Sequence, residues 1–482
     1  QNPSVLPAES LYAIEHDTMD TTFRSMYQGL YIYLSARKER RDLLLSQRPP
    51  RFDESLDSMI SRSEDDFTRI ALKAKAAQDY FLLIGPPGTG KTSCALKKMV
   101  ETFHADKDAQ ILLLSYTNRA VDEICKSLAS IAPAVDFIRV GSELSCDEAY
   151  RGHLIENELS SCNRRSEVYE RIRNCRIIVG TVAAISGKPE LFRLKHFDVA
   201  IIDEATQILE PQLLGILCAR GEDGKDAIDK FVLIGDHKQL PAVVQQNTEQ
   251  SAIYDESLLS IGLTNLKDSL FERLYRNCTA TVHRSYDMLC RQGRMHPEVA
   301  LFANRAFYGG RLIPVGLPHQ IESSDTICRL AFYPSVPEKV GASAKINYSE
   351  ARIVADLAVR IYEDHQADFD ESRTLGIITP YRSQIALIKK EIESLGIPAL
   401  NRILVDTVER FQGSERDVII YSFCVNYPYQ LKFLSNLTEE EGVLIDRKLN
   451  VALTRARKQM FITGVPELLE RNPLYKSLLK LI

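Results

Sequence analysis

A glycine-rich segment of the sequence has the residue types that bind a nucleoside triphosphate. An apolar run, Phe81–Ile84, leads into Gly85, Pro86, Pro87, Gly88, Thr89, Gly90, Lys91, Thr92 and Ser93. Glycines let several backbone N–H groups point into one concave site, and the N-terminus of a following helix adds partial positive charge. In this pattern Lys91 is expected to reach the β- and γ-phosphates and Thr92 to hold Mg²⁺. We therefore predict that this segment binds ATP.

A second, acidic segment supplies the remaining groups of a hydrolytic site. Asp203 and Glu204 directly follow another apolar run, Val199–Ile202. At the end of a strand, Asp203 is expected to hold the same Mg²⁺, and Glu204 to orient and deprotonate the attacking water. Alone, an Asp-Glu pair is as commonly a solvated turn. Together the two segments favour hydrolysis over a small-molecule kinase, which would not need Glu204 at that place.

The composition limits the class of protein. A chain of 482 residues suggests two or three domains. No apolar run approaches the ~20 residues of a membrane span, and the first residues lack a basic-then-apolar signal segment. The ten cysteines include no Cys-x-x-Cys pair, which argues against a zinc or iron–sulfur site. We expect a cytoplasmic protein without a membrane segment, and the start at Gln1 suggests a piece of a longer protein.

The net charge of −5 means that any nucleic-acid path must be a local basic groove rather than a field around the whole molecule.

Short apolar runs alternate with helical stretches in two parts of the chain, which predicts an α/β fold with two parallel sheets in tandem. The first domain is expected over 61–272, with a small helical insertion at 141–174, and the second over 273–482. In the first domain the predicted strands are Tyr80–Ile84, Ile111–Ser115, Phe137–Val140, Arg176–Gly180, Val199–Ile202 and Phe231–Gly235. In the second they are Ile327–Phe332, Leu375–Thr379, Arg402–Val405, Val418–Phe423 and Met460–Thr463. Loops are expected at 244–257 and 425–446.

Residues 1–60 are expected to form a helical, stalk-like N-terminal segment. Apolar residues recur there at helical spacing and predict a helix that packs through them. They are Phe23, Met26, Tyr27, Leu30, Tyr31 and Leu34.

Further blocks follow the glycine-rich segment. They are Ser115–Asp122, Gly180–Val182, Gly235–Ala242, Arg294–Pro297, Thr379–Gln384, Thr407–Glu415 and Asn450–Arg457. In this order the chain resembles superfamily 1 helicases of the 5′→3′ branch, which includes the nonsense-decay RNA helicase and its DNA-acting relatives. The resemblance covers about residues 80–465. It implies two RecA-like domains, the cofactors ATP and Mg²⁺, and a single-stranded nucleic acid as partner.

The resemblance also implies roles around the ATP. Gln239 would sense the γ-phosphate, Arg294 would reach it, and Arg455 would be the arginine finger. Tyr381 would stack on adenine, and Glu415 belongs to the block that joins nucleic acid to nucleotide. Hydrolysis spreads negative charge over the γ-phosphate, so a cation arriving from a second domain would stabilise it only when the cleft is closed. We therefore expect a cleft whose closure depends on the nucleotide.

Small polar residues near predicted strand ends are candidates for contacts with a nucleic-acid backbone. By resemblance these are Thr117, Asn118, Thr181, Pro241 and Thr407. Such contacts would be mainly to phosphate and sugar. Each residue alone is more often a turn residue or a helix cap.

The sequence also departs from the family's pattern. Residues 62–68 lack the glutamine with which the family reads adenine, and Gly293 stands where the family often has a tyrosine before Arg294. The small β-barrel that many relatives carry is not visible in residues 1–60. These differences leave the base selectivity open.

The sequence thus predicts a helicase or translocase that couples ATP hydrolysis to 5′→3′ movement on single-stranded DNA or RNA, working as a monomer. The alternative is an ATPase switch or scaffold that is stimulated by nucleic acid but does not unwind it. Nothing in the residues distinguishes DNA from RNA, because no feature reports recognition of a 2′-hydroxyl.

Overall fold

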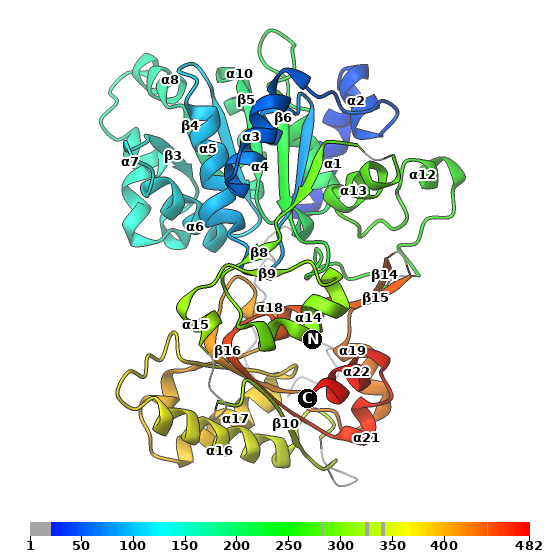
Figure 1. The fold of residues 1–482 in the computed structure, drawn as a ribbon. Helices are drawn as coiled ribbons and strands as arrows, with labels where there is room; N and C mark the ends of the chain where they lie inside the picture. The colour runs from blue at the N-terminus through cyan, green and yellow to red at the C-terminus, as the bar shows by residue number, and fades with distance from the viewer. Residues whose placement is uncertain (1–20, 248, 282, 323–326, 339–342, 441) are drawn as a thin grey trace, which may run out of the picture.

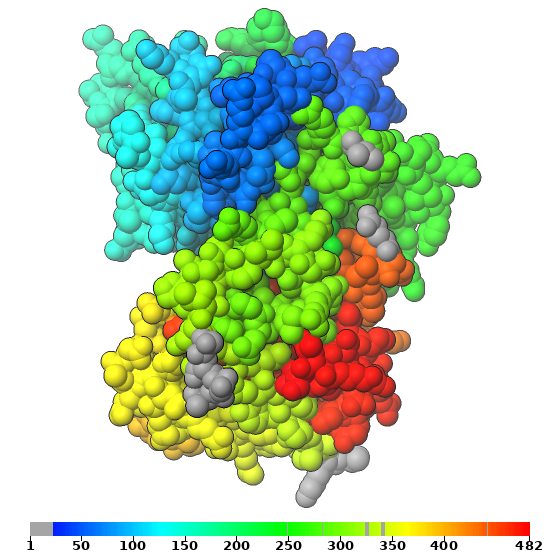
Figure 2. Space-filling view, viewed as in Figure 1, coloured from blue at the N-terminus to red at the C-terminus, as the bar shows by residue number. Residues whose placement is uncertain are grey.

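The computed structural model describes residues 21–482 apart from residues 248, 282, 323–326, 339–342 and 441. The chain forms two lobes, one above the other in Figure 1, each built around a sheet. The first 20 residues of the expected N-terminal segment lie outside the described part. The space-filling view shows the two lobes in contact along a narrower waist (Figure 2).

The first lobe contains a seven-stranded parallel sheet with strand order β3-β4-β2-β5-β6-β1-β7. Its strands are β1 (Tyr80–Ile84), β2 (Ile111–Ser115), β3 (Phe137–Val140), β4 (Ile177–Thr181), β5 (Phe197–Ile202), β6 (Ile228–Gly235) and β7 (Tyr286–Met288). Nearly every residue of the central strands is buried. A parallel sheet buried on both faces needs helices on both sides.

Those helices form two separate cores. On one face the core uses α4 (Asp66–Ala76), α5 (Lys97–His104) and α6 (Asn118–Ala129). On the other it uses α2 (Lys38–Leu44), α9 (Val182–Ser186), α10 (Glu190–Leu194), α11 (Glu210–Leu217) and α13 (Leu270–Ala280). The shorter helices are α3 (Asp57–Arg62), which lies beside α4, and α12 (Glu256–Ser260), which lies at the edge of this lobe (Figure 1).

The second lobe has a five-stranded parallel sheet with strand order β10-β16-β13-β11-β12. The strands are β10 (Leu330–Pro334), β11 (Leu375–Ile378), β12 (Leu404–Asp406), β13 (Arg416–Ser422) and β16 (Ala456–Gly464). One face is covered by α16 (Tyr348–Asp364) and α17 (Arg382–Ser394). The other is covered by α14 (Pro297–Tyr308), α18 (Val408–Phe411), α19 (Leu431–Leu434), α20 (Arg447–Leu453), α21 (Pro466–Leu469) and α22 (Pro473–Leu481).

The predicted fold class is confirmed: the structure has two parallel-sheet α/β lobes in tandem. The insertion is helical, with α7 (Ile155–Glu158) and α8 (Arg165–Asn174). The expected boundary at residue 272 falls inside α13, whose Leu270 and Leu274 are part of the first lobe's core. Strand β7 also pairs with β1, so the first lobe reaches residue 288. The sequence gives little signal for a strand of three residues.

The stretch 425–446 is not the loop that the sequence predicted. It contains α19 and an antiparallel hairpin of β14 (Leu437–Glu440) and β15 (Val443–Asp446). In Figure 1 this hairpin leaves the second lobe and extends toward the first. A short parallel pair, β8 (Arg291–Gln292) and β9 (Ile313–Pro314), lies where the chain passes between the lobes (Figure 1).

The N-terminal helix α1 (Thr21–Ser35) packs on the first lobe, but not through the predicted apolar stripe. Tyr27 and Tyr31 are 73% and 72% exposed. The contact instead uses Gly29, where an added Cβ would lie 2.4 Å from the carbonyl oxygen of Pro211 and 3.2 Å from the backbone nitrogen of Gly215 on α11. Two glycines let the helix backbones approach closely, so the close contact selects the glycine face. The prediction about the packing face was wrong.

Candidate active site

The predicted phosphate cradle, residues 85–93, lies at the carboxyl edge of the first sheet. Gly85 N donates to Gly235 O at 2.9 Å, which joins the ends of β1 and β6. Gly88 and Gly90 have φ of +74° and +76°, a conformation that strongly favours glycine. The following helix begins at Lys91 with a π-helical turn and continues as α5. The cradle is therefore a strand–turn–helix, as a phosphate loop requires.

Lys91 and Glu204 form an ion pair in the centre of the site. The Nζ of Lys91 lies 3.1 Å from Oε1 of Glu204, and both side chains are largely buried. The lysine stem crosses Gly85 so closely that an added Cβ there would lie 2.0 Å from its Cγ. Burial disfavours both charges, but each compensates the other. The pKa of Lys91 is raised and that of Glu204 is lowered from their usual values.

The backbone of Glu204 has the left-handed conformation, with φ of +53°. This region costs a non-glycine residue of order 1 kcal/mol, and such strain is common at functional sites. The second carboxylate oxygen, Oε2, accepts a hydrogen bond of 2.9 Å from Gln207 Nε2. The turn and this amide together aim the carboxylate at the cradle.

Thr92 and Asp203 are adjacent, as the sequence predicted. The Thr92 hydroxyl donates to Oδ2 of Asp203 at 2.5 Å. Burial, with the charge of Glu204, raises the pKa of Asp203 to about 6. A hydroxyl and a carboxylate are the oxygen ligands that Mg²⁺ prefers. A divalent cation would also neutralise the buried carboxylates, so the residues fit a Mg²⁺ site.

Arg455 comes from the second lobe and reaches the first. It is buried, and its Nη2 donates to Oε1 of Gln239 at 3.1 Å. The amide nitrogen of Gln239 donates in turn to Asp236 at 2.7 Å, which fixes the orientation of the glutamine. Burial and the charge of Arg294 lower the pKa of Arg455, and the charge of Glu204 partly offsets this effect. Two guanidinium groups thus converge beside the cradle.

Arg294 packs directly against the phosphate loop. An added Cβ at Gly88 would lie 2.4 Å from Cβ of Arg294, and Gly293 N donates to Gly88 O at 2.8 Å. The guanidinium is held by the second lobe, with Nε 2.5 Å from Glu415 Oε2 and Nη1 donating to Thr454 O at 3.2 Å. Gly293 stands where the family often has a tyrosine. It lies against the cradle and brings no aromatic ring there.

A buried polar network connects these groups, and part of it was not foreseen. The Tyr308 hydroxyl donates to Asp236 at 2.7 Å and accepts from Asn450 Nδ2 at 2.8 Å. The same amide nitrogen of Asn450 also contacts Lys238 O at 2.7 Å. Asp236 and Asn450 stand in blocks read from the sequence, but Tyr308 stands in none. Its position at the end of α14 gave no signal.

The predicted nucleic-acid residues lie at the carboxyl ends of strands. Ser115 and Thr181 are paired neighbours on β2 and β4, so Thr117 and Thr181 lie at the same edge. Both hydroxyls cap helices: Thr117 accepts from Ala120 N at 3.2 Å, and Thr181 accepts from Ala184 N at 3.1 Å. Asn118 is the first residue of α6.

The remaining predicted strand contacts are near the coupling loop and in the second lobe. Pro241 lies in the loop of residues 235–242 at the end of β6, which we call the coupling loop. Thr407 lies at the start of α18, after β12. The Tyr381 hydroxyl accepts from Gln430 Nε2 at 3.1 Å. That hydrogen bond is within the second lobe, and the role of Tyr381 at adenine stays a prediction.

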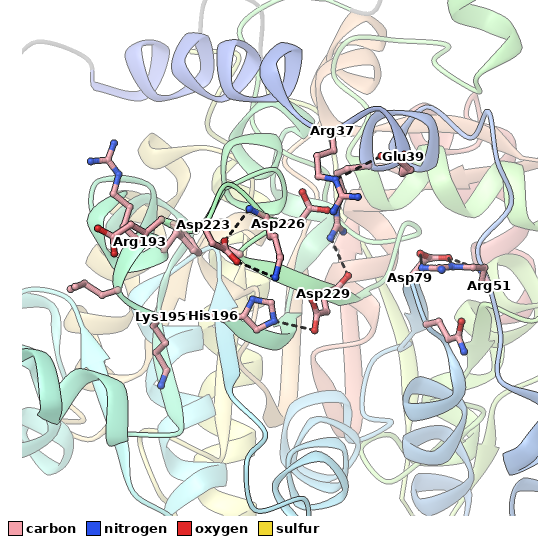
Figure 3. A pocket seen from close by; sticks show the side chains of 18 of the residues that line it. Arg37, Glu39, Arg51, Asp79, Arg193, Lys195, His196, Asp223, Asp226 and Asp229 are labelled. Carbon is pink, nitrogen blue, oxygen red and sulfur yellow. Dashed lines mark hydrogen bonds and ion pairs between the residues drawn. The ribbon is translucent and has the colours of Figure 1, made fainter.

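A large cavity lies at the opposite edge of the first sheet. Its volume is about 1030 Å³, and residues at or just before the starts of β1, β5 and β6 line it, among them Asp79, His196 and Asp229. Figure 3 shows its charged side chains paired with one another, such as His196 with Asp229 at 3.0 Å and Arg51 with Asp79 at 2.9 Å. The cavity is remote from the carboxyl ends of the strands, so it does not belong to the nucleotide site.

Comparisons with known proteins agree with this arrangement. Two family models, each described as an AAA domain, match residues 62–168 with 155–247 and residues 266–467. The DNA replication ATP-dependent helicase/nuclease DNA2 of Gallus gallus is 29% identical over 502 residues, covering 99% of this chain and 45% of that protein. The DNA polymerase alpha-associated DNA helicase A of Saccharomyces cerevisiae is 24% identical over 537 residues, covering 95% and 73%.

The crystal structure of Arterivirus nonstructural protein 10, a helicase, is 14% identical with a TM-score of 0.40, and covers 82% of this chain and 61% of that one. The chain spans less than half the length of the Gallus gallus relative.

The fold, the cradle and the family models together define an ATPase of two RecA-like lobes, the class to which helicases belong. The resemblance of this chain to the superfamily 1 helicases is confirmed, because it is similar over nearly its whole length to DNA2-type helicases. Within the described residues, no helix has the length and apolar character needed to cross a membrane.

Proposed function

We propose that this chain is a motor that binds single-stranded DNA or RNA, hydrolyses ATP with Mg²⁺ and moves 5′→3′, unwinding duplexes as it moves. One observation carries the proposal: Arg455 of the second lobe donates to Gln239 beside the cradle of the first. An ATP in the cradle would therefore touch both lobes. Its binding favours the closed cleft, and its hydrolysis removes the γ-phosphate that holds the cleft closed.

In this proposal each charged residue has a separate task. Lys91 leaves Glu204 to bind the β- and γ-phosphates, and Glu204 is then free to accept a proton from the attacking water. Arg294 and Arg455 stabilise the charge that develops on the γ-phosphate. Thr92 and Asp203 would hold Mg²⁺, which supplies charge neutralisation between the phosphate oxygens. The triphosphate of ATP is a polyanion, and its binding between the two guanidinium groups would explain why they lie so close together.

The nucleic-acid path is proposed along the carboxyl ends of the strands. Thr117 and Thr181 mark helix N-termini at one edge, where backbone N–H groups favour phosphate. Burial, with the charge of Arg119, lowers the pKa of Arg416. These two arginines come from opposite lobes, and an anion bound near them would relieve their repulsion. The proposed partner is therefore a phosphate backbone, read with little dependence on base sequence.

The test is ATP hydrolysis with and without DNA and RNA homopolymers, followed by strand displacement on duplexes with 5′ or 3′ tails. We expect stimulation by at least one polymer and displacement only from the 5′ tail. Glu204→Gln is the inactive control. Absence of stimulation by any polymer would contradict the proposal. Stimulated hydrolysis without displacement would favour a switch or scaffold over a translocating helicase.

A further inference from the structure

One continuous segment of the second lobe carries Arg455 and makes a series of contacts with the first lobe. We name it the anchor segment: the β14–β15 hairpin and α20 through Arg455, residues 437–440 and 442–455. It lies along the coupling loop, residues 235–242, and the neighbouring helix α13. The contacts are Glu440 with His237, Arg447 with Glu272, Asn450 with Lys238 and Arg455 with Gln239.

The contact between Arg447 and Glu272 is a buried ion pair between the lobes. The two side chains are only 6% and 4% exposed. Glu272 also caps the start of α13, where its Oε2 accepts a 3.0 Å hydrogen bond from Ser269 N. Burial would raise the pKa of Glu272, but the charge of Arg447 and the hydrogen bond from Ser269 N, with smaller contributions, together lower it. A buried charge pair is stable only while both partners remain, so this pair holds the start of α20 on α13.

A second contact joins the hairpin to the coupling loop. His237 Nε2 lies 3.1 Å from Glu440 Oε2, and the His237 side chain is 3% exposed. The imidazole also packs against Tyr275 of α13, with ring centroids 4.7 Å apart. Burial would raise the pKa of Glu440, but the contact with His237 keeps it below its usual value. The carboxylate is therefore held as an anion beside the loop that contains Gln239.

Helix α20 connects these contacts to Arg455. Asp446 caps its first turn by accepting from Lys448 N at 3.1 Å, and the Tyr475 hydroxyl donates to the same carboxylate at 2.9 Å. A capped helix of this length is a rigid rod of about 10 Å. Arg447 is its first residue, and Arg455 follows its last turn. A displacement at Arg447 is therefore passed on to Arg455.

We propose that Arg447 and Glu440 are positioning residues: they tie the anchor segment to the first lobe and so set how often Arg455 reaches the γ-phosphate. They do not touch the nucleotide. Loss of a tie lowers the fraction of the closed, reactive arrangement, while ATP still binds the cradle of the first lobe. The inference rests on the proposed function, since it assumes that Arg455 acts on ATP.

The test uses a cycle of Glu272→Gln, Arg447→Met and the double variant in the full chain. Glutamine at 272 can still accept the hydrogen bond that begins α13, so only the charge is lost. Each single variant leaves a buried unpaired group and lowers the melting temperature. We expect kcat of ATP hydrolysis to fall about tenfold, with the KM for ATP nearly unchanged.

The double variant separates positioning from simple stability. It removes both charges, so the melting temperature should recover toward the wild-type value, whereas kcat should stay low because the tie is still missing. Recovery of kcat together with stability would overturn the proposal. Glu210→Gln is the matched control, because Glu210 pairs with Arg273 of the same helix α13 but within the first lobe. It should lower stability and leave kcat unchanged.

Glu440→Gln is the second variant if the buried pair cannot be altered without unfolding, because Glu440 is 29% exposed. A lower kcat at unchanged KM supports the proposal, and an unchanged kcat contradicts it. Every variant is measured with and without a single-stranded polymer. If the wild-type chain gains nothing from any polymer, the proposed function fails, while the comparison of basal kcat values still tests the positioning.

Discussion

The two halves of the candidate active site are built differently. In the first lobe, Lys91, Thr92, Asp203 and Glu204 form close pairs within one lobe. In the other half, Arg294 and Arg455 are held by contacts with the second lobe, and Arg455 reaches Gln239 of the first lobe across the cleft. The first half exists whenever the first lobe is folded. The second exists only when the lobes are docked, so it is the half through which binding of a strand can control hydrolysis.

The largest expected effect tests the first half. Glu204→Gln removes the proposed base and should lower kcat about 10³-fold, with and without a polymer, while ATP binding remains. Lys91→Ala should also abolish turnover, because a main phosphate contact is lost. ATP binding is measured by calorimetry and turnover by phosphate release. A fully active Glu204→Gln would refute the assigned role, and Glu222→Gln at the distant cavity is the control.

Arg455→Lys tests the second half. Lysine keeps the charge but not the planar fork that meets Gln239 and a phosphate together. We expect hydrolysis stimulated by polymer to fall about 10³-fold, with a much smaller change in ATP affinity. Steady-state kinetics at saturating polymer measure both values. If the variant lost only affinity for ATP, Arg455 would contribute to binding of the substrate and not to the hydrolytic step. The proposed difference between the two halves of the site would then be wrong. Arg402→Lys is the control, because Arg402 is exposed and pairs with Glu371 elsewhere in the second lobe.

A smaller effect is expected from Tyr308→Phe. The change removes one hydroxyl that donates to Asp236 and accepts from Asn450. Leaving these buried groups less satisfied should cost about 1–2 kcal/mol of stability and lower stimulated kcat several-fold. Denaturant unfolding and ATPase assays measure the two effects. An unchanged kcat in a destabilised protein would limit the network to a structural role.

The smallest effect on ATP hydrolysis is expected from Glu350, which lies in the second lobe and contributes to stability in a pH-dependent way. Burial raises the pKa of Glu350 from 4.5 to about 7, although Ser422 Oγ and Cys424 N donate to it. A raised pKa in the folded state favours the protonated form. The stabilising contribution is therefore present below pH 4.5 and is lost as the pH rises through 7, on the order of 3 kcal/mol in total.

Glu350→Gln should remove this dependence, so that the variant gains stability relative to the wild type between pH 5 and 8. Melting temperatures of both proteins across this range measure the difference. ATP binding by the first lobe should not change. A constant difference between the two proteins at all pH values would contradict the assignment.

The sequence by itself determined the first half of the site and the strands that carry it. Lys91 and Thr92 are placed by the glycines immediately before them, and Asp203 and Glu204 by the apolar run that ends at 202. These relations are local: a buried strand, a turn and a helix position their own side chains. The central strands were predicted to within a few residues for the same reason, since continuous apolar runs indicate parallel strands buried on both faces.

Only the tertiary structure decided how the lobes meet. Tyr308, the pair of Glu272 with Arg447, and Gly293 lying on Gly88 have no signal in the local sequence. The same holds for α1, whose exposed tyrosines look like a packing face until Gly29 is placed on α11. Contacts between residues far apart in the chain depend on which surfaces fit together. Periodicity and motif spacing do not contain that information.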